Sequence, residues 1–315
     1  MKVTDLIKNS SVPFTSIEII PPRKGTSMET LFAELEVLMR YKPAFMSVTS
    51  HAHERSVEEV DGKKVERMKH KRLDTNAICI AAQSRLGVEP TPHLICRGFT
   101  KDETEDVLLT LHFHGIENVL ALRGDGPLAD AQTAASFVNE HASDLVEQIE
   151  RMNDGVYLDP VERAEKTDFC IGVAGYPEKH FEAPDMETDL AYLKKKVDAG
   201  AHFIITQMFF DNEAFYRFRD DVARLGIQVP VIPGIKPLYK KQHLEVLPRI
   251  FYTKIPQSVQ DSINRFDKEE DIHRAGIDST IAQCKDLLAH GVPGIHFYSM
   301  SVAKPTSEVL NGLMA

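Results

Sequence analysis

The chain has 315 residues, of which 43% are hydrophobic, 27% charged and 8% aromatic. This composition excludes a disordered tail and a small disulfide-stapled domain, and it predicts a large hydrophobic core. Asp and Glu number 47 against 37 Lys and Arg, and the resulting net charge of −10 disfavours duplex nucleic acid and anionic membranes as partners.

The cysteines and the hydropathy pattern bear on the compartment. The four cysteines form no C-x-x-C pair and have no zinc-type His spacing, so we expect buried, reduced thiols and no metal site. No stretch reaches the roughly 18 apolar residues of a membrane span. Residues 1–12 lack the apolar run of a signal peptide. We therefore expect a soluble, cytoplasmic protein.

Short apolar runs rich in β-branched residues alternate with longer segments of helical period along the whole chain. They predict eight strands, at residues 15–20, 45–49, 93–96, 118–122, 169–174, 203–207, 229–232 and 295–298. Helix starts are predicted by capping boxes at Thr26 with Glu29 and at Thr100 with Glu103, and by an N-cap at Asp211. Helix ends are predicted where glycine suits a left-handed C-cap: Gly115, Gly200, Gly226 and Gly291.

The alternation indicates the fold class. Runs such as 203–206 and 229–232 are apolar on both faces, which is typical of a parallel sheet covered by helices. Because the alternation has no break, it predicts one α/β domain over residues 1–315, a (β/α)₈ TIM barrel. An open, doubly wound sheet is the alternative. Two connections are long: the charged residues 50–75 after the second strand, a surface excursion, and residues 236–276 between the seventh and eighth strands, with extra helical turns.

Glu18 is the first candidate for chemistry, because it is a carboxylate in an otherwise apolar strand. Barrel enzymes react at the C-terminal ends of their strands. Burying an unpaired carboxylate is costly, so Glu18 should be paired or protonated, and a carboxyl with a raised pKa suits a general acid. An outward-facing side chain or a structural ion pair is the alternative.

Other polar groups gather at predicted strand ends. The fourth strand ends in Leu122-Arg123-Gly124-Asp125-Gly126-Pro127. This segment would place a cation and an anion beside a ligand, and its glycines would let the backbone approach the ligand closely. The alternative is a plain turn, which uses the same residue types. His93 and Gln207 also interrupt apolar strands and are further candidates for the site. The alternative is that each is a core residue whose hydrogen bonds are satisfied within the protein. One lysine of the run 194–196 could reach a phosphate, although such runs are usually solvated. No Rossmann or P-loop glycine motif occurs.

From about Phe14 to Leu310 these residues fall into motifs that follow one another as in the methylenetetrahydrofolate reductases. The motifs include Ile17-Glu18-Ile19-Ile20-Pro21-Pro22, Pro92-His93-Leu94-Ile95-Cys96, Leu122-Arg123-Gly124-Asp125, Ala174-Gly175-Tyr176-Pro177-Glu178-Lys179-His180, Ile205-Thr206-Gln207-Met208-Phe209-Phe210, Ile232-Pro233-Gly234-Ile235 and His296-Phe297-Tyr298. The sequence therefore resembles this family, specifically its bacterial single-domain type.

The resemblance implies a barrel that binds FAD without a Rossmann motif. The residues it implies as FAD contacts are Thr49, His93, Arg123, Gly124, Asp125, His141, Ala142, Ala174, Tyr176, His180, Asp189 and Lys196, with Lys196 opposite the pyrophosphate. The implied substrate contacts are Gln207, Phe209, Tyr298 and Leu247. As in bacterial members of the family, we expect a homo-oligomer.

The implied reaction has two hydride transfers in turn. NADH or NADPH reduces FAD and leaves, and reduced FAD then reduces 5,10-methylenetetrahydrofolate to 5-methyltetrahydrofolate, which supplies methyl groups for methionine synthesis. In this ping-pong scheme Glu18 would donate the proton that opens the folate ring. Asp125 would be the second catalytic group, anchoring the pterin and tuning the charge that develops.

The sequence departs from the family pattern in four places, one of which is the connection from Asp125 to His141. Ser299-Met300-Ser301-Val302 replaces the usual Thr-Leu-Asn-Arg, so an arginine for folate or nicotinamide is missing. Leu247 stands where some bacterial members have phenylalanine, and Ser50-His51-Ala52-His53 replaces an aromatic or glycine-rich turn. Two other functions remain open. A pterin-binding transferase or aldolase without flavin would leave residues 176–180 unused, and a catalytically silent folate-binding paralogue would not need Glu18 and Asp125.

Overall fold

The computed structural model describes residues 1–52, 54–60, 62–125 and 135–314. Its main sheet has nine parallel strands in the order β10-β11-β1-β2-β5-β6-β7-β8-β9. The strands are β1 (Phe14–Ile19), β2 (Met46–Val48), β5 (Pro90–Ile95), β6 (Asn118–Leu122), β7 (Cys170–Gly175), β8 (Phe203–Thr206), β9 (Val231–Ile232), β10 (Gly234–Ile235) and β11 (Gly294–Tyr298). This arrangement confirms the predicted α/β barrel.

The ring closes through one interrupted segment. β9 pairs with β8 and β10 pairs with β11, and only Pro233 separates β9 from β10. Proline has no N–H for the ladder, and the N–H of Gly234 donates to the side-chain Oγ1 of Thr206 at 3.0 Å instead of to a backbone carbonyl. The seventh predicted strand, residues 229–232, therefore begins two residues later than expected, and a second short strand that was not predicted, β10, follows it after Pro233.

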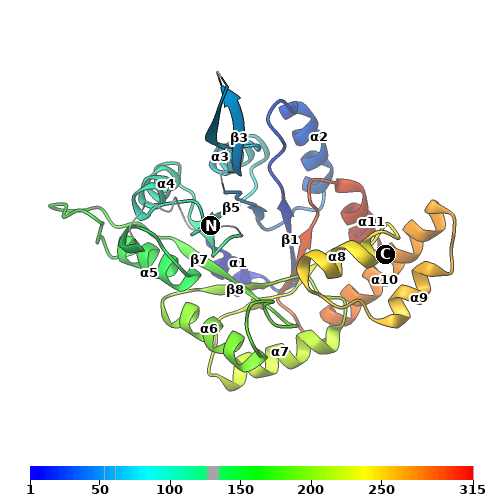
Figure 1. The fold of residues 1–315 in the computed structure, drawn as a ribbon. Helices are drawn as coiled ribbons and strands as arrows, with labels where there is room; N and C mark the ends of the chain where they lie inside the picture. The colour runs from blue at the N-terminus through cyan, green and yellow to red at the C-terminus, as the bar shows by residue number, and fades with distance from the viewer. Residues whose placement is uncertain (53, 61, 126–134, 315) are drawn as a thin grey trace.

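Helices cover the outer face of the ring, as Figure 1 shows. They are α2 (Met28–Met39), α3 (Thr75–Leu86), α4 (Lys101–Phe113), α5 (Ala142–Asn153), α6 (Met186–Asp198), α7 (Asn212–Arg224), α10 (Glu269–Ala289) and α11 (Ala303–Met314). The long connection after β10 contains α8 (His243–Phe251) and α9 (Gln257–Asn264), which confirms its predicted extra turns, and a 3₁₀ turn covers Ala135–Phe137. No helix in the described ranges is long and apolar enough to cross a membrane.

Most predicted helix signals are confirmed. Thr100 and Glu103 form a complete capping box, and Asp211 caps α7. The glycines predicted as helix ends, Gly115, Gly200, Gly226 and Gly291, all have positive φ. The capping box at Thr26 is wrong. The N–H of Thr26 turns back to Arg23 O at 3.0 Å, and Ser27 becomes the N-cap, accepting from Glu29 N at 3.2 Å.

Residues 50–75, the predicted surface excursion, contain an antiparallel hairpin of β3 (Glu54–Val60) and β4 (Lys63–Lys69). The hairpin stands clear of the barrel at the top of Figure 1. Its base is tied to the loop after β1, because Lys24 N donates to Lys71 O and Leu73 N donates to Pro22 O, both at 3.0 Å. The hairpin therefore lies beside the C-terminal ends of β1 and β2.

The barrel interior is apolar at its N-terminal end and polar at its C-terminal end. An additional helix, α1 (Val3–Asn9), covers the N-terminal end, where Val3 N donates to Asn118 Oδ1 at 2.8 Å. Val3 packs there in a cluster with Phe45, Leu120, Cys170, Phe203, Ile205 and Ile232. All four cysteines are buried free thiols, as predicted. Buried polar side chains fill the interior between this apolar cluster and the C-terminal ends of the strands, and they define the candidate site.

Candidate active site

Glu18 lies near the C-terminal end of β1 and is only 7% exposed. The strand register places it opposite Tyr298 of β11 on one side and Ser47 of β2 on the other. Because paired positions of parallel strands point to the same face, these side chains share the barrel interior. The prediction that Glu18 faces inward is thus confirmed.

Two buried imidazoles flank the Glu18 carboxylate. His93 Nε2 lies 3.4 Å from Glu18 Oε2 and His296 Nε2 lies 4.0 Å from it. His296 is fixed from behind, since its Nδ1 is 2.8 Å from Ser16 Oγ and its ring stacks on Phe45 at 5.7 Å. Burial lowers the pKa of His93 to about 4, against the opposing charge of Glu18, so His93 is neutral at pH 7.

A lysine and a tyrosine complete this group. Lys236, the residue after β10, is 5% exposed, and its Nζ donates to Tyr298 O at 2.9 Å. The Tyr298 hydroxyl donates to Thr206 O at 2.6 Å, and burial raises the pKa of Tyr298 well above its usual range. We call Glu18, His93, His296, Tyr298 and Lys236 the acid cluster.

The unusual residues 299–302 hold the end of β1. Ser299 Oγ donates to Glu18 O at 2.6 Å, and Met300 N donates to the same oxygen at 3.3 Å. Ser301 Oγ donates to Ile20 O at 2.9 Å. Met300 and Ser301 have φ of 55° and 62°, a costly conformation for residues with a side chain. The substituted turn therefore fixes the backbone beside Glu18.

Several buried polar atoms inside the barrel have no hydrogen-bond partner within the described part of the chain. They are Ser47 Oγ on β2, Thr49 Oγ1 directly after β2, Thr91 Oγ1 and His93 Nε2 on β5, and His296 Nε2 on β11. Unpaired buried polar groups are costly and uncommon in proteins. Their concentration at the C-terminal end of the barrel indicates a site for a polar ligand.

Beside the acid cluster, residues after β6 and β7 form a second group, which we call the β6–β7 rim. It comprises Arg123, Gly124, Asp125, Tyr176, His180, Asp189 and Lys196. Arg123 forms an ion pair with Glu182, and Asp125 is exposed. Gly124 has φ of +78°, and a Cβ there would lie 3.0 Å from Ile95 Cβ, so any other residue would be strained and crowded at this position. Residues 126–134 fall outside the described residues.

Lys196 turns inward, unlike its two neighbours in the lysine run. Its Nζ donates to Ala174 O, at the end of β7, at 2.6 Å and lies 6.0 Å from the Tyr176 ring centre. Lys194 instead pairs with Asp198 on the outer face, and Lys195 is exposed. Burial lowers the pKa of Lys196 to about 8, opposed by the charge of Asp189. That one lysine of the run binds a phosphate stays a prediction, and Lys196 is the lysine that turns toward the end of β7.

The 176–180 motif is held in place by the start of α6. Asp189, in the first turn of α6, is 8% exposed and accepts from His180 N at 3.1 Å. The rings of Tyr176 and His180 meet edge to face at 4.7 Å. Burial raises the pKa of Asp189, against this N–H and the charge of Lys196. The motif is therefore a fixed wall at the end of β7.

The other predicted cofactor contacts lie on neighbouring elements. Thr49 follows β2, and its N–H donates to Ile19 O at 3.0 Å. His141 and Ala142 begin α5, and His141 O accepts from Cys96 Sγ at 3.4 Å, at the end of β5. Ala174 is the partner of Lys196. Structure thus brings these predicted positions to the same end of the barrel.

Of the predicted substrate contacts, Gln207 is polar and half-buried, whereas Phe209 and Leu247 are buried in apolar packing. Gln207 follows β8 and is half-buried, and its side-chain oxygen accepts from Met208 N at 2.8 Å. Phe209 is fully buried and stacks on Phe215 at 5.2 Å, outside the barrel interior. Leu247 is 6% exposed in a hydrophobic cluster with Met208 and others. Neither Phe209 nor Leu247 presents an open surface to a ligand in this structure.

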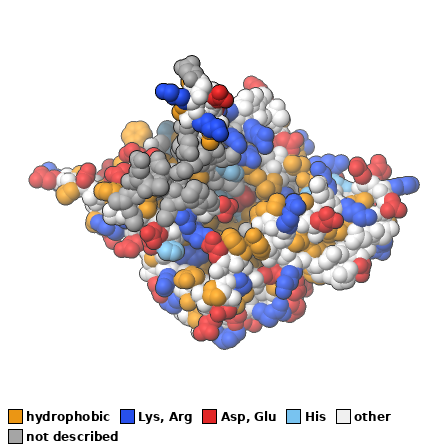
Figure 2. All heavy atoms as spheres, viewed as in Figure 1, with side chains coloured by type: hydrophobic (Ala, Val, Ile, Leu, Met, Phe, Trp, Pro, Cys, Tyr) orange, Lys and Arg blue, Asp and Glu red, His pale blue; other side chains and the backbone are white. Residues whose placement is uncertain are grey.

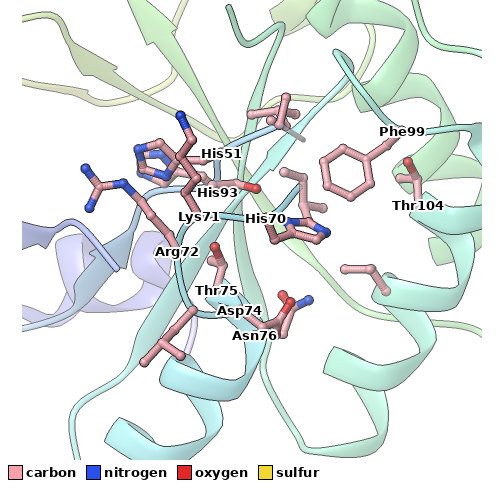
Figure 3. A pocket seen from close by; sticks show the side chains of 16 residues that line it. His51, His70, Lys71, Arg72, Asp74, Thr75, Asn76, His93, Phe99 and Thr104 are labelled. Atoms are coloured by element: carbon pink, nitrogen blue, oxygen red, sulfur yellow. The ribbon is translucent and has the colours of Figure 1, made fainter. Parts of the chain in front are cut away.

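A cavity of about 140 Å³ adjoins the acid cluster on the hairpin side. Figure 3 shows His51 and His93 on one side of it and Phe99 and Thr104 on the other. Lys71 and Arg72, from the base of the hairpin, also line it, and Arg72 donates to Pro21 O at 2.7 Å. This cavity gives an anionic or aromatic ligand room beside His93.

Figure 2 shows acidic and basic side chains interspersed over the face in view. A charged ligand must therefore be met by individually placed residues, of which Arg123, Lys196 and Lys236 lie at this end of the barrel. Within the described ranges, no three His, Cys, Asp or Glu side chains gather as a metal site would require.

Two members of the acid cluster were missed as site residues by reasoning from the sequence. Lys236 follows the apolar run Ile232-Pro233-Gly234-Ile235, and His296 lies inside the last apolar strand. A charged or polar residue at the end of an apolar strand was the available signal, the same one that identified Glu18. Ser16, which holds His296, is two residues before Glu18 on the same face of β1.

Known proteins give the family context. Residues 2–314 match the family model described as methylenetetrahydrofolate reductase. The chain is 32% identical to 5,10-methylenetetrahydrofolate reductase of Escherichia coli, over 95% of this chain and 90% of that protein. It is 34% identical to methylenetetrahydrofolate reductase (NADH) 1 of Arabidopsis thaliana, over 99% of this chain and 51% of that protein. The chain thus spans about half the length of its plant relatives.

A solved structure shares the fold. It is an uncharacterised protein from Clostridium thermocellum described as binding two copies of 5-methyl-5,6,7,8-tetrahydrofolic acid. The two structures superpose with a TM-score of 0.64 at 15% identity, over 99% of this chain and 97% of the other. At this identity the likeness supports the barrel fold.

Proposed function

The chain belongs to the methylenetetrahydrofolate reductase family, and we propose that it reduces 5,10-methylenetetrahydrofolate to 5-methyltetrahydrofolate with FAD as cofactor and NADH as reductant. The observation that carries the proposal is the Glu18 carboxylate, 7% exposed, among unpartnered polar atoms at the catalytic end of a barrel. We propose NADH and not NADPH as the reductant because the names of plant relatives specify NADH.

The residues at the rim fit FAD. Lys196 and Arg123 offer cations for the pyrophosphate, and Gly124 allows close backbone approach. Thr49 Oγ1 is a buried polar atom without a hydrogen-bond partner in the described residues, and a flavin ring could pair with it. When bound, FAD would accept a hydride from NADH and pass it to the folate. The cavity lined by His51, His93 and Phe99 provides additional room at this side.

Glu18 is the proposed general acid. Its carboxyl would hold the proton that goes to folate N10, so that the N10–methylene bond breaks and the methylene carbon becomes an acceptor for hydride. His93 and His296 keep the carboxyl in place while His93 remains neutral. Water is largely excluded around Glu18, which strengthens each electrostatic contact.

Two polar residues are proposed to orient the pterin. Gln207, which follows β8, presents its amide at the open end of the barrel, and Asp125 is an exposed carboxylate on the β6–β7 rim. Amide and carboxylate groups suit the paired donors and acceptors of a pterin ring. Tyr298 lies opposite Glu18 in the strand register, and its hydroxyl donates to the carbonyl of Thr206, the residue before Gln207.

The experiment is an anaerobic titration of the purified protein. The protein should bind FAD, bleach with NADH, and recover its flavin colour when methylenetetrahydrofolate is added, with formation of 5-methyltetrahydrofolate. NADPH in place of NADH tests the choice of reductant, and the mass in solution tests the expected homo-oligomer. Failure to take up FAD, or bleaching without recovery by the folate, would contradict the proposed function.

A further inference from the structure

Lys236 is a buried cation that has no role in the proposed reaction. Ile235 of β10 pairs with Phe297 of β11, so Lys236 comes level with Tyr298, and Tyr298 pairs with Glu18 of β1. Three adjacent strands therefore bring Lys236, Tyr298 and Glu18 to one level of the barrel. The hydrogen bond from Lys236 Nζ to Tyr298 O, 2.9 Å long, fixes the ammonium group there.

Burying an ammonium group is costly unless a negative charge compensates it. Within the described residues, Lys236 has no carboxylate within 4.0 Å, and the charge that raises its pKa is that of Glu18. Burial has the larger effect and lowers the pKa of Lys236 to about 8, so the group is still mostly protonated at pH 7. Lys236 is therefore level with Glu18 in the strand register without forming a direct ion pair with it.

Other titratable groups lie near Lys236 and Glu18, and burial keeps two of their imidazoles neutral. Around Glu18 these are His93, His296 and Tyr298, and burial holds the pKa of His93 at about 4. Around Lys236 they are Tyr239, whose ring centre is 5.7 Å from Nζ, and His243, whose pKa burial also lowers to about 4. At pH 7 both His93 and His243 are neutral, so they cannot replace the ammonium group.

On the basis of the proposed function, we propose that Lys236 is a positioning residue for the acid Glu18, whose buried ammonium group stabilises the carboxylate left when Glu18 has given its proton to the folate. A cation near an acid favours the ionised form and makes the acid stronger. The transferred proton goes to folate N10 and no other bond is made at Lys236, so the lysine keeps its proton throughout the step.

The test uses Lys236→Gln, which keeps a donor for Tyr298 O and removes the charge. Lys236→Arg keeps the charge, and Lys240→Met removes an exposed lysine from the same segment. Single-turnover oxidation of the reduced protein by methylenetetrahydrofolate is measured against pH. In parallel, the infrared band of the protonated Glu18 carboxyl, identified by its loss in Glu18→Gln, is titrated in the protein without folate.

In Lys236→Gln, we expect the Glu18 band and the descending limb of the folate step to move to higher pH by about one unit. The maximal rate of the folate step should fall several-fold, because the acid is weaker. Lys236→Arg should restore both, and Lys240→Met and the NADH step should show no shift. These shifts distinguish a charge effect from a loss of structure.

An unchanged titration of Glu18 in folded Lys236→Gln would overturn the inference. Should that variant not fold, Lys236→Met, which removes the charge and fills similar space, gives the same reading. A wild-type protein that takes up no flavin or is not oxidised by the folate would instead refute the proposed function, while the infrared titration would still decide whether Lys236 acts on Glu18.

Discussion

The acid cluster and the β6–β7 rim lie at the same end of one barrel but are built differently. The acid cluster stands on or directly after strands β1, β5, β10 and β11, and Glu18, His93, His296 and Lys236 are at most 7% exposed. The rim lies on the segments after β6 and β7 and on α6, and Asp125 is exposed. A rigid, dry cluster suits proton transfer, whereas a wetter rim suits the binding of a large charged cofactor.

The largest expected effect comes from Glu18→Gln, which separates the two regions most sharply. It removes the acid but keeps the size of the side chain, so turnover with methylenetetrahydrofolate should fall about 10²- to 10⁴-fold. FAD binding should be unchanged because the rim is untouched. Steady-state assays and flavin titration measure the two effects, and Glu36→Gln, at an exposed position on α2, is the control. Equal loss of FAD binding would break the division between the regions.

The pH dependence of stability should follow the buried imidazole of the acid cluster. The folded-state pKa of His93 is about 4 and its ordinary value is 6.5, so the unfolded chain binds the extra proton between these values. The contribution of His93 to the free energy of unfolding is therefore present above pH 6.5 and lost towards pH 4, by up to about 3 kcal/mol.

Denaturant unfolding of wild type and His93→Gln over this pH range measures that contribution. His93→Gln should show a shallower loss of stability on acidification. His243→Gln is a matched comparison outside the cluster, because the pKa of His243 is also about 4. If the slope is the same in wild type and His93→Gln, the imidazole is not held neutral by burial.

On the rim, Lys196→Met should weaken FAD binding by about 10- to 100-fold, the usual value of one charge-assisted hydrogen bond. Lys195→Met removes a neighbouring lysine that is exposed near the Tyr192 ring, and it should leave FAD binding unchanged. Flavin fluorescence titration measures both variants. Equal weakening in the two would mean that the general charge of the helix, and not the inward direction of Lys196, attracts the cofactor.

The smallest effect is expected for Gly124→Ala, which should lower the free energy of unfolding by about 1–2 kcal/mol through its positive φ and its close approach to Ile95. Gly115→Ala is the comparison, because Gly115 has φ of +70° but no atom within 4 Å of an added Cβ. Thermal unfolding measures both. A larger loss in Gly124→Ala than in Gly115→Ala isolates the crowding at the rim.

The barrel was predictable because its signals are local. Alternating apolar runs marked the strands, and glycine marked the helix ends. Local signals failed where a nearby bond decided the outcome, as at Thr26, whose N–H bonds to Arg23 O and passes the cap to Ser27. The split between β9 and β10 likewise depends on Pro233 and on the bond from Gly234 to Thr206.

The site was predictable where one residue carries the signal and not where packing decides. Glu18 was found because a carboxylate in an apolar strand is unusual. Lys236 carries a similar local signal, a charged residue after an apolar run, but its position level with Glu18 follows only from the register of three strands. Phe209 shows the converse, since the side chain that follows β8 packs on Phe215 in the outer core and not in the site.

The most direct test of the account follows the two half-reactions of Glu18→Gln by stopped-flow absorbance under anaerobic conditions. NADH should reduce the bound flavin at the wild-type rate, whereas methylenetetrahydrofolate should reoxidise it at least about 100 times more slowly than in wild type. Slowing of both half-reactions to the same extent would contradict the assignment of Glu18 to the folate step.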